Sequence, residues 1–308
     1  MKEIEFKGFN DYELNVAIWD EVQEPKAVLQ IMHGMVEHIA RYDDFARYLN
    51  ANGYIVIGDD HRGHGKTAKG RLGVTPKGDC FRDTVEDAIA IGKWAVEQYN
   101  LPLMLFGHSY GSFLSQSYIQ KAGKQLKAVI LCGSACKNTA DVKLGRGVAK
   151  MQYSLFGGEK PAKMIKDMSF GPYNAQFKEG KENAWLTRDD SKREEYNSDP
   201  MCNYTMCIAF YKSLFGALGK LYKPDAMAAV RKDLPILIIS GDCDPVGGNG
   251  KLVDRLYNIY KEYGVMDVSI KLYNGARHEL INELNKDEVY ADVLRFLDAH
   301  AGGVKEAE

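Results

Sequence analysis

The sequence predicts an α/β fold in which a mostly parallel, eight-stranded sheet carries helices on both faces. Short apolar runs of strand length alternate with longer segments whose apolar residues recur at helical spacing. Such alternation is typical of parallel sheets with crossover helices. The 308 residues are enough to bury one large core, so we expect one domain that carries an insertion.

The expected elements follow one another regularly in the first part of the chain. Residues 3–22 alternate apolar and polar side chains around Asn10 and Asp11, which predicts two antiparallel edge strands joined by a turn. Buried strands and helices then alternate, with strands within 26–34, 54–60, 103–107 and 128–134 and helices within 41–53, 83–100 and 110–123. Each helix therefore returns the chain to the start of another parallel strand.

The alternation breaks after Ser134 and resumes near residue 233. The intervening segment contains Gly-Gly, Gly-Pro and Lys-Pro breaks and no clear buried strand. A strand at 234–241, a helix at 250–264, a strand from residue 268 and a last helix from residue 287 follow. We therefore predict an α/β core of residues 1–136 and 233–308, with residues 137–232 forming an inserted, mainly helical cap.

Composition and charge exclude several classes of function. The net charge of -2 and the 27% of charged residues are unlike those of a nucleic-acid-binding polycation. The first residues contain no apolar segment of signal-peptide length, and the chain contains no run of about 18 apolar residues, which predicts a cytoplasmic protein without integral membrane segments.

The six cysteines do not form paired C-x-x-C sets, so we expect reduced, buried thiols and neither a metal nor another cofactor. A disulfide between Cys202 and Cys207 is the alternative, which a reducing compartment disfavours.

The stretch LFGHSYGSFL carries the pattern G-x-S-x-G between a predicted strand and a predicted helix. In this position the pattern describes a sharp turn that exposes a nucleophilic serine, and small residues at Gly107 and Gly111 let the strand and helix approach each other. We therefore predict Ser109 as a nucleophile.

A serine hydroxyl needs a base, and the base needs an orienting acid, each at the end of a later strand. The loop after the run ILIIS offers Asp242 and Asp244, and His278 follows the last strand in the required order. We favour Asp244 over Asp242 because the loop needs room to turn and Pro245 fixes the backbone beyond it. His278 is the predicted base.

Acyl transfer also needs hydrogen-bond donors for the developing oxyanion. One donor in this architecture is the N–H of the residue after the serine, here Tyr110, and the other comes from the loop after the third strand. That loop reads MHGMVEH, so we assign the second donor to the N–H of Met35, with Gly34 allowing the backbone to turn inward.

Four segments together resemble the monoacylglycerol lipase and lysophospholipase group of the serine-aminopeptidase-like α/β-hydrolases: HGMVEHIARYDDFARYLNANGYIVIGDDHRGHGKT, GHSYG, GDCDPVG and GARHEL. They lie in the expected order within residues 33–279. The resemblance implies an α/β-hydrolase fold with the catalytic triad Ser109, Asp244 and His278. It also implies Met35 and Tyr110 as oxyanion donors.

The resemblance further implies that Glu37 and Arg41, from the pattern H-G-x-x-E-H-x-x-R, form a polar network beneath the site for the substrate's head group. A partly buried ion pair that only fixes the loop is the alternative. Two departures from the group are Tyr110, where methionine is common, and Met35, where a small residue is usual. Both add bulk near the expected acyl pocket.

The predicted cap is rich in methionines and aromatic residues, which together make an adaptable apolar lining. We predict a cofactor-independent serine carboxylic-ester hydrolase that forms an acyl-enzyme. Its expected partner is a small ester with an apolar acyl group, similar to a monoacylglycerol or lysophospholipid. Transient contact with a lipid surface and the oligomeric state stay open.

Three alternatives remain at this stage. A short-chain or aromatic, feruloyl-like carboxylesterase would use the same machinery. An aminopeptidase-type amide hydrolase would need acidic groups in the cap, for which Glu194 and Glu195 are available. A binding module without catalysis is disfavoured by the intact serine, aspartate and histidine.

Overall fold

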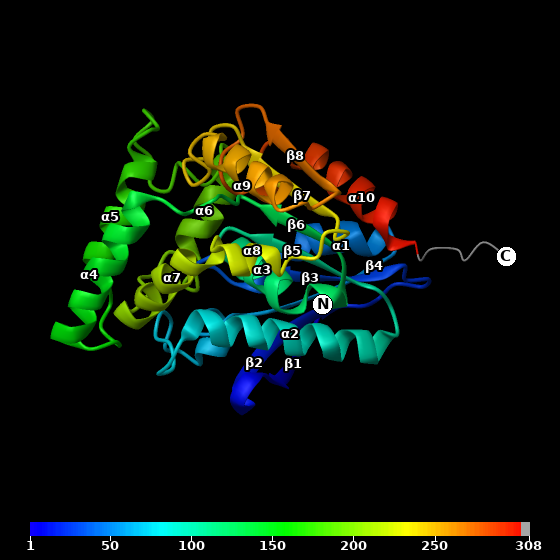
Figure 1. The fold of residues 1–308 in the computed structure, drawn as a ribbon, viewed down its shortest axis with the longest axis horizontal. Helices are drawn as coiled ribbons and strands as arrows, with labels where there is room; N and C mark the ends of the chain where they lie inside the picture. Colours follow the sequence, from blue (N-terminus) through cyan, green and yellow to red (C-terminus); the bar gives the residue numbers. More distant parts are fainter. Residues whose placement is uncertain (303–308) are drawn as a thin grey trace.

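The computed structural model describes residues 1–302 and contains one eight-stranded sheet with helices on both faces (Figure 1). Its strands are β1 (Lys2–Lys7), β2 (Glu13–Trp19), β3 (Ala27–Met32), β4 (Tyr54–Asp59), β5 (Leu103–His108), β6 (Leu126–Cys132), β7 (Ile236–Gly241) and β8 (Val268–Tyr273). They are arranged in the order β1-β2-β4-β3-β5-β6-β7-β8. The predicted fold class is confirmed.

The sheet is antiparallel only at one edge. β1 pairs antiparallel with β2, and β2 pairs antiparallel with β4, whereas every later pair is parallel. The turn between β1 and β2 places Asn10 at φ 57° and ψ 40°, a left-handed conformation that asparagine tolerates well. The predicted pair of antiparallel strands at this edge is therefore confirmed.

Helices from separate parts of the chain cover the two faces. The helices are α1 (Asp43–Ala51), α2 (Cys80–Tyr99), α3 (Tyr110–Ala122), α4 (Ala140–Phe156), α5 (Lys163–Asn174), α6 (Asp190–Ser198), α7 (Ile208–Leu221), α8 (Pro224–Ala228), α9 (Lys251–Glu262) and α10 (Lys286–Ala301). Buried residues of α1 and α10 form one apolar cluster with the sheet, and those of α2, α3 and α9 form another on the opposite face. The strands β3, β4, β5 and β7 are buried along their whole length because both faces are covered.

The segment between β6 and β7 contributes no strand to the sheet and contains helices α4 to α8. α7 packs into the same apolar cluster as α2 and α3, whereas α4 and α5 stand at one end of the molecule (Figure 1).

All six cysteines are free thiols, so the alternative disulfide between Cys202 and Cys207 is not formed. No helix within residues 1–302 combines the length and the apolar character that crossing a membrane requires.

Candidate active site

Ser109 lies at the turn where β5 ends and α3 begins. Its backbone has φ 52° and ψ -114°, a region that residues with a side chain rarely adopt, and its N–H donates to the Cys132 carbonyl oxygen at 2.9 Å. This strained turn places Ser109 directly before the first turn of α3.

The two glycines of the G-x-S-x-G pattern are required by close approach of the backbone. A Cβ atom on Gly111 would lie 2.0 Å from the Met32 carbonyl oxygen, and one on Gly107 would lie 2.2 Å from the Ser115 hydroxyl. Only glycine therefore lets α3 pack this tightly against β3 and β5.

Three side chains from separate strand ends form a continuous row of hydrogen bonds. The Nε2 atom of His278 lies 2.8 Å from the Ser109 hydroxyl, and its Nδ1 atom lies 2.9 Å from Oδ2 of Asp244. Ser109 follows β5, Asp244 follows β7 and His278 follows β8. The geometry matches a serine nucleophile, a base and an orienting acid.

Asp244 is fully buried and receives two further hydrogen bonds. The Ser240 hydroxyl donates to Oδ2 at 3.1 Å, and the Val246 N–H donates to Oδ1 at 2.8 Å. Burial opposes ionisation, but His278 and these donors outweigh it and hold the pKa of Asp244 below its usual value. Asp242 instead accepts the Gly275 N–H at 2.7 Å, so the structure joins Asp244 rather than Asp242 to His278.

Two aromatic rings enclose the imidazole of His278. The Trp185 ring lies 5.0 Å from it and the His108 ring lies 4.8 Å from it, measured between centroids. Burial and the neighbouring His278 lower the pKa of His108 to about 3. His108 is therefore neutral near pH 7, and its ring packs against His278 without adding a positive charge beside it.

Met35 and Tyr110 both border the cavity beside Ser109. Neither backbone N–H donates a hydrogen bond to another group of residues 1–302, so both are available to a ligand. The preceding Gly34 N–H donates to Oε1 of Glu37 at 2.5 Å, and a Cβ on Gly34 would collide with that carboxylate. Glu37 thereby fixes the turn that presents the Met35 N–H.

Glu37 belongs to a buried ion network. Arg41 pairs with Glu37 and makes a two-pronged contact with Glu279, at 2.9 Å and 2.7 Å. The Arg41 guanidinium also stacks on the Tyr196 ring, 4.8 Å from its centroid. Burial opposes the charged form of Glu279, but Arg41 outweighs it and lowers the pKa of Glu279, whereas burial raises the pKa of Glu37. Glu37 borders a cavity and Arg41 lies behind it.

The histidines of the early loops lie beneath the serine turn. His33 stacks on His61 with ring centroids 4.0 Å apart, and His64 packs against Tyr110 at 6.1 Å. Burial lowers the pKa of His64 to about 3. The structure places none of these three histidines in hydrogen-bond contact with Ser109, in keeping with the structural role predicted for the DHRGHG segment.

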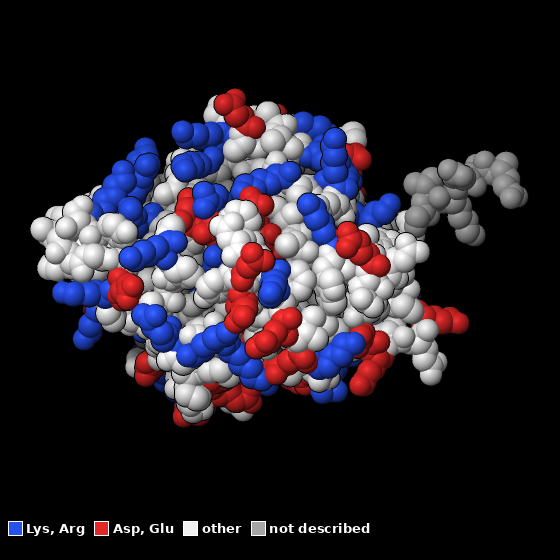
Figure 2. Space-filling view, turned by 90° about the horizontal axis from the view of Figure 1, so that it is seen from below, with Lys and Arg blue, Asp and Glu red and all other residues white. Residues whose placement is uncertain are grey.

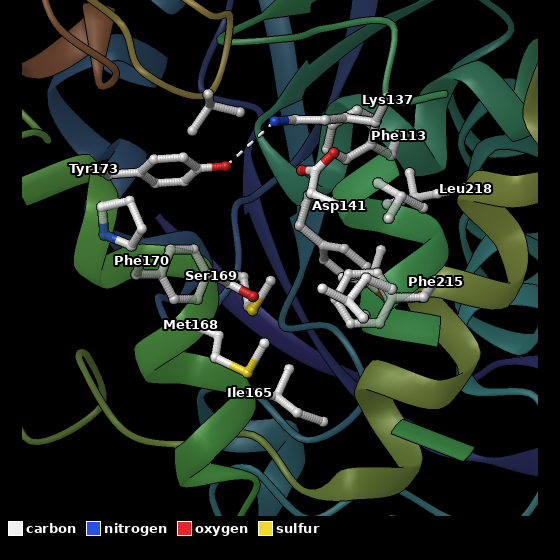
Figure 3. A pocket seen from close by; sticks show the side chains of 18 of the residues that line it. Phe113, Lys137, Asp141, Ile165, Met168, Ser169, Phe170, Tyr173, Phe215 and Leu218 are labelled. Carbon is white, nitrogen blue, oxygen red and sulfur yellow. Dashed lines mark hydrogen bonds between the residues drawn. The ribbon is translucent and has the colours of Figure 1, made fainter. Parts of the chain in front are cut away.

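Two cavities meet at Ser109. The larger, of about 370 Å³, is lined mainly by apolar side chains of α3, α4, α5 and α7 (Figure 3). The smaller, of about 60 Å³, is bordered by polar groups that include Glu37, Lys166, Tyr196 and His278. The larger volume lies in the range of small-molecule sites.

Sequence reasoning missed several residues that support this arrangement. Glu279 directly follows His278 in the GARHEL segment. This position next to the predicted base is the one feature of the sequence that points to a role for Glu279 in the site. Trp185 comes from the segment 137–232, where nothing in the sequence separates it from ordinary apolar residues. Ser240 is the penultimate residue of the strand before Asp244, and no sequence pattern marks it.

Within residues 1–302, one group of side chains has ligand atoms close enough together to hold a metal ion. His38, Asp199 and Cys202 offer atoms within 4.8 Å of one another. His38 already shares a hydrogen bond of 2.9 Å with Asp199. This group lies outside the row formed by Ser109, His278 and Asp244.

The sheet, the serine turn and the hydrogen-bonded row define the class of the protein as an α/β-hydrolase. The model of the family described as Serine aminopeptidase, S33 matches residues 23–285, and the chain belongs to this family. The predicted recognition is thereby confirmed.

Curated relatives and solved structures are also similar to the chain. It is 27% identical over 299 residues to the monoacylglycerol lipase of Mycolicibacterium smegmatis, covering 96% of each chain. It is 25% identical over 270 residues to the human monoglyceride lipase, covering 86% of this chain and 80% of that one. A carboxyl esterase from Bacillus coagulans, solved with glycerol, is 29% identical, with a TM-score of 0.88 over 98% of this chain and 99% of that one. The predicted enzyme class, a carboxylic-ester hydrolase, is confirmed by these likenesses.

Proposed function

We propose that the enzyme cleaves its ester through an acyl-enzyme formed on Ser109. The observation that carries this proposal is the hydrogen-bonded row of Ser109, His278 and Asp244 at the junction of the two cavities. His278 takes the hydroxyl proton while Oγ of Ser109 bonds to the ester carbonyl carbon. The negative oxygen that forms accepts hydrogen bonds from the N–H groups of Met35 and Tyr110.

The intermediate collapses when the bond to the alcohol oxygen breaks and His278 returns its proton to that oxygen. The alcohol leaves, and the acyl group stays on Ser109. His278 then takes a proton from a water molecule, the resulting hydroxyl bonds to the acyl carbon, and the acid is released as Ser109 recovers its proton. Ionised Asp244 holds the imidazole in the correct tautomer and stabilises its positive form throughout.

The proposed substrate is a monoacylglycerol or a lysophospholipid-like ester. The larger, apolar cavity suits an acyl chain, and the smaller cavity suits the alcohol portion because its border includes hydrogen-bonding groups. Lys166 at that border donates to the Asn203 carbonyl at 3.1 Å, and burial lowers the pKa of Lys166. The names of two curated relatives support the monoacylglycerol substrate.

We further propose that residues 137–232 act as a cap that meets lipid surfaces. Large apolar side chains of α4 and α5 are exposed, among them Leu144, Met151, Leu155, Phe156 and Met164. In Figure 2 an uncharged bulge lies at the end where Figure 1 places α4 and α5. Exposed apolar side chains of this kind, beside lysines, favour transient contact with a lipid surface.

An activity panel tests the proposal. Monoacylglycerols and lysophospholipids of increasing chain length should be cleaved, and Ser109→Ala should lower kcat on the order of 10⁶-fold, as expected for loss of a triad nucleophile. Ser117→Ala on the same helix is the matched control and should keep wild-type activity. A fluorophosphonate probe that fails to label Ser109 would contradict the acyl-enzyme.

The two glutamates considered for the amide-hydrolase alternative lie away from the cavities at Ser109. Glu194 and Glu195 are both exposed on α6, Glu195 pairs with Lys192, and neither borders the two cavities at Ser109. We therefore expect much faster turnover of a p-nitrophenyl ester than of an aminoacyl anilide. The opposite order would favour the aminopeptidase reaction.

A further inference from the structure

One buried lysine in the larger cavity has no role in the proposed chemistry. Lys137 follows β6, only 8% of its surface is exposed, and its side chain extends into the cavity (Figure 3). Its position is fixed, because the Lys137 N–H donates to the Tyr222 hydroxyl at 3.2 Å and that hydroxyl donates to the Ala135 carbonyl at 2.8 Å. These bonds fix the backbone from which the Lys137 side chain enters the cavity.

The partners of the Lys137 amine leave donor capacity unused. Its Nζ atom donates to the Tyr173 hydroxyl at 3.2 Å, and no carboxylate of residues 1–302 lies within 4.0 Å of it. An ammonium carries three donors, and burying one beside a single neutral partner is costly. We therefore expect the ligand to supply a further hydrogen-bond acceptor to the Lys137 amine.

Two other polar groups face the same end of the cavity. Tyr173 accepts from Lys137, so its own hydroxyl proton remains free to donate. The carboxylate of Asp141 on α4 points toward this end as well (Figure 3). Most other side chains that line the cavity are apolar, so these three groups form a separate polar corner.

We propose, on the basis of the acyl-enzyme function above, that Lys137, Tyr173 and Asp141 select acyl groups that carry a hydroxyl. A hydroxyl both accepts and donates, so it satisfies Lys137 or Tyr173 as donors and Asp141 as an acceptor together. A carboxylate would satisfy Lys137 but would meet the like charge of Asp141. Asp141 is exposed and Tyr173 is half-buried, so an unsubstituted acyl chain would leave mainly the buried Lys137 amine without an acceptor once water is displaced.

The test compares kcat/KM for matched pairs of glycerol or methyl esters. Each pair contains an acyl group with a hydroxyl and its hydroxyl-free parent, for example an ω-hydroxyacyl and an acyl chain, or 4-hydroxycinnamoyl and cinnamoyl. The wild type should prefer the hydroxylated member of at least one pair by roughly tenfold to a hundredfold, the range expected when a charged group is left without its hydrogen bond. Lys137→Met should abolish this preference, and Tyr173→Phe should reduce it.

The control is Lys150→Met, which removes an exposed lysine from α4 and should keep the wild-type preference. Thermal unfolding shows whether each variant is folded. If Lys137→Met is unfolded, the preference measured for Tyr173→Phe tests the inference in its place. The inference is overturned if the wild type favours the parent esters or a dicarboxylic half-ester, or if the preference survives Lys137→Met. Failure of the wild type to hydrolyse any ester would instead overturn the proposed function and this inference together.

Discussion

Replacing Arg41 by methionine should destabilise the fold by more than any surface substitution. The Arg41 side chain is 11% exposed, and it separates the carboxylates of Glu37 and Glu279, which are 4% and 5% exposed. Methionine fills a similar volume but leaves two buried negative charges without a partner. Breaking a buried pair in this way costs about 3–5 kcal/mol, so the melting temperature should fall by roughly 6–20 °C.

The stability lost in Arg41→Met should increase as the pH rises. In the wild type the lowered pKa of Glu279 adds stability above the unfolded-state pKa of about 4.3, and this stability disappears as the pH falls toward the folded-state pKa of about 2. In Arg41→Met the carboxylates should have raised pKa values, so their penalty appears only as the pH rises and they ionise. The difference between the two proteins should therefore be smallest near pH 2, should already be present near pH 4.5 and should be largest near pH 8.

Urea denaturation followed by circular dichroism, at several pH values, measures this difference. Adding Glu279→Gln to Arg41→Met should restore part of the stability, because one of the unpaired charges is removed. Arg41→Met alone should also lower kcat. It removes the partner of Glu37, and Glu37 accepts the Gly34 N–H next to the proposed oxyanion donor Met35. If the free energy of unfolding of Arg41→Met is unchanged between pH 5 and pH 8, Arg41 does not neutralise two buried carboxylates and the argument is refuted.

Three further substitutions, two of them paired with a control substitution, test the site. Asp244→Asn should lower kcat on the order of 10⁴-fold in the ester assay because the amide favours the wrong tautomer of His278. Asp242→Asn is its control: it keeps an oxygen that accepts the Gly275 N–H, so turnover in the same assay should be retained. Gly111→Ala should lower the melting temperature and abolish probe labelling, because the new Cβ would lie 2.0 Å from the Met32 carbonyl oxygen. Trp185→Ala should cost about 3–5 kcal/mol in urea denaturation and also lower kcat, whereas Trp185→Phe should retain most of both by keeping a ring against His278.

The sheet and the serine turn could be predicted because their signals are local. A buried parallel strand is a short apolar run, and the turn at Ser109 needs glycines at two fixed positions. The order of serine, acid and histidine also follows from the order of strands. The choice between Asp242 and Asp244 was harder, because both follow β7 within one loop and only the folded turn decides which carboxylate reaches His278.

The supporting contacts could not be predicted because they join distant parts of the chain. Arg41 and Glu279 are 238 residues apart, and no periodicity or spacing links them. Lys137 illustrates the same limit, since its surroundings include Tyr173 on α5, which is 36 residues away in the chain. An apolar-rich segment predicts a lining in general, but the position of one amine within it is a tertiary property.

The segment between β6 and β7 is attached to the sheet in two physically different ways. Around the His278 loop the attachment is polar: the His278 N–H donates to the Trp185 carbonyl and the Glu279 N–H to the Leu186 carbonyl, at 3.4 Å and 2.7 Å. α4, in contrast, meets the rest of the molecule through apolar side chains such as Val142, which packs into the main cluster.

Directional hydrogen bonds thus hold the groups around the proposed site of charge development, where small displacements are costly. Non-directional apolar contacts line the proposed acyl cavity, where chains of different shape can be accommodated by side-chain repacking. Preorganised chemistry and tolerance of the acyl chain can therefore coexist in one segment of the chain.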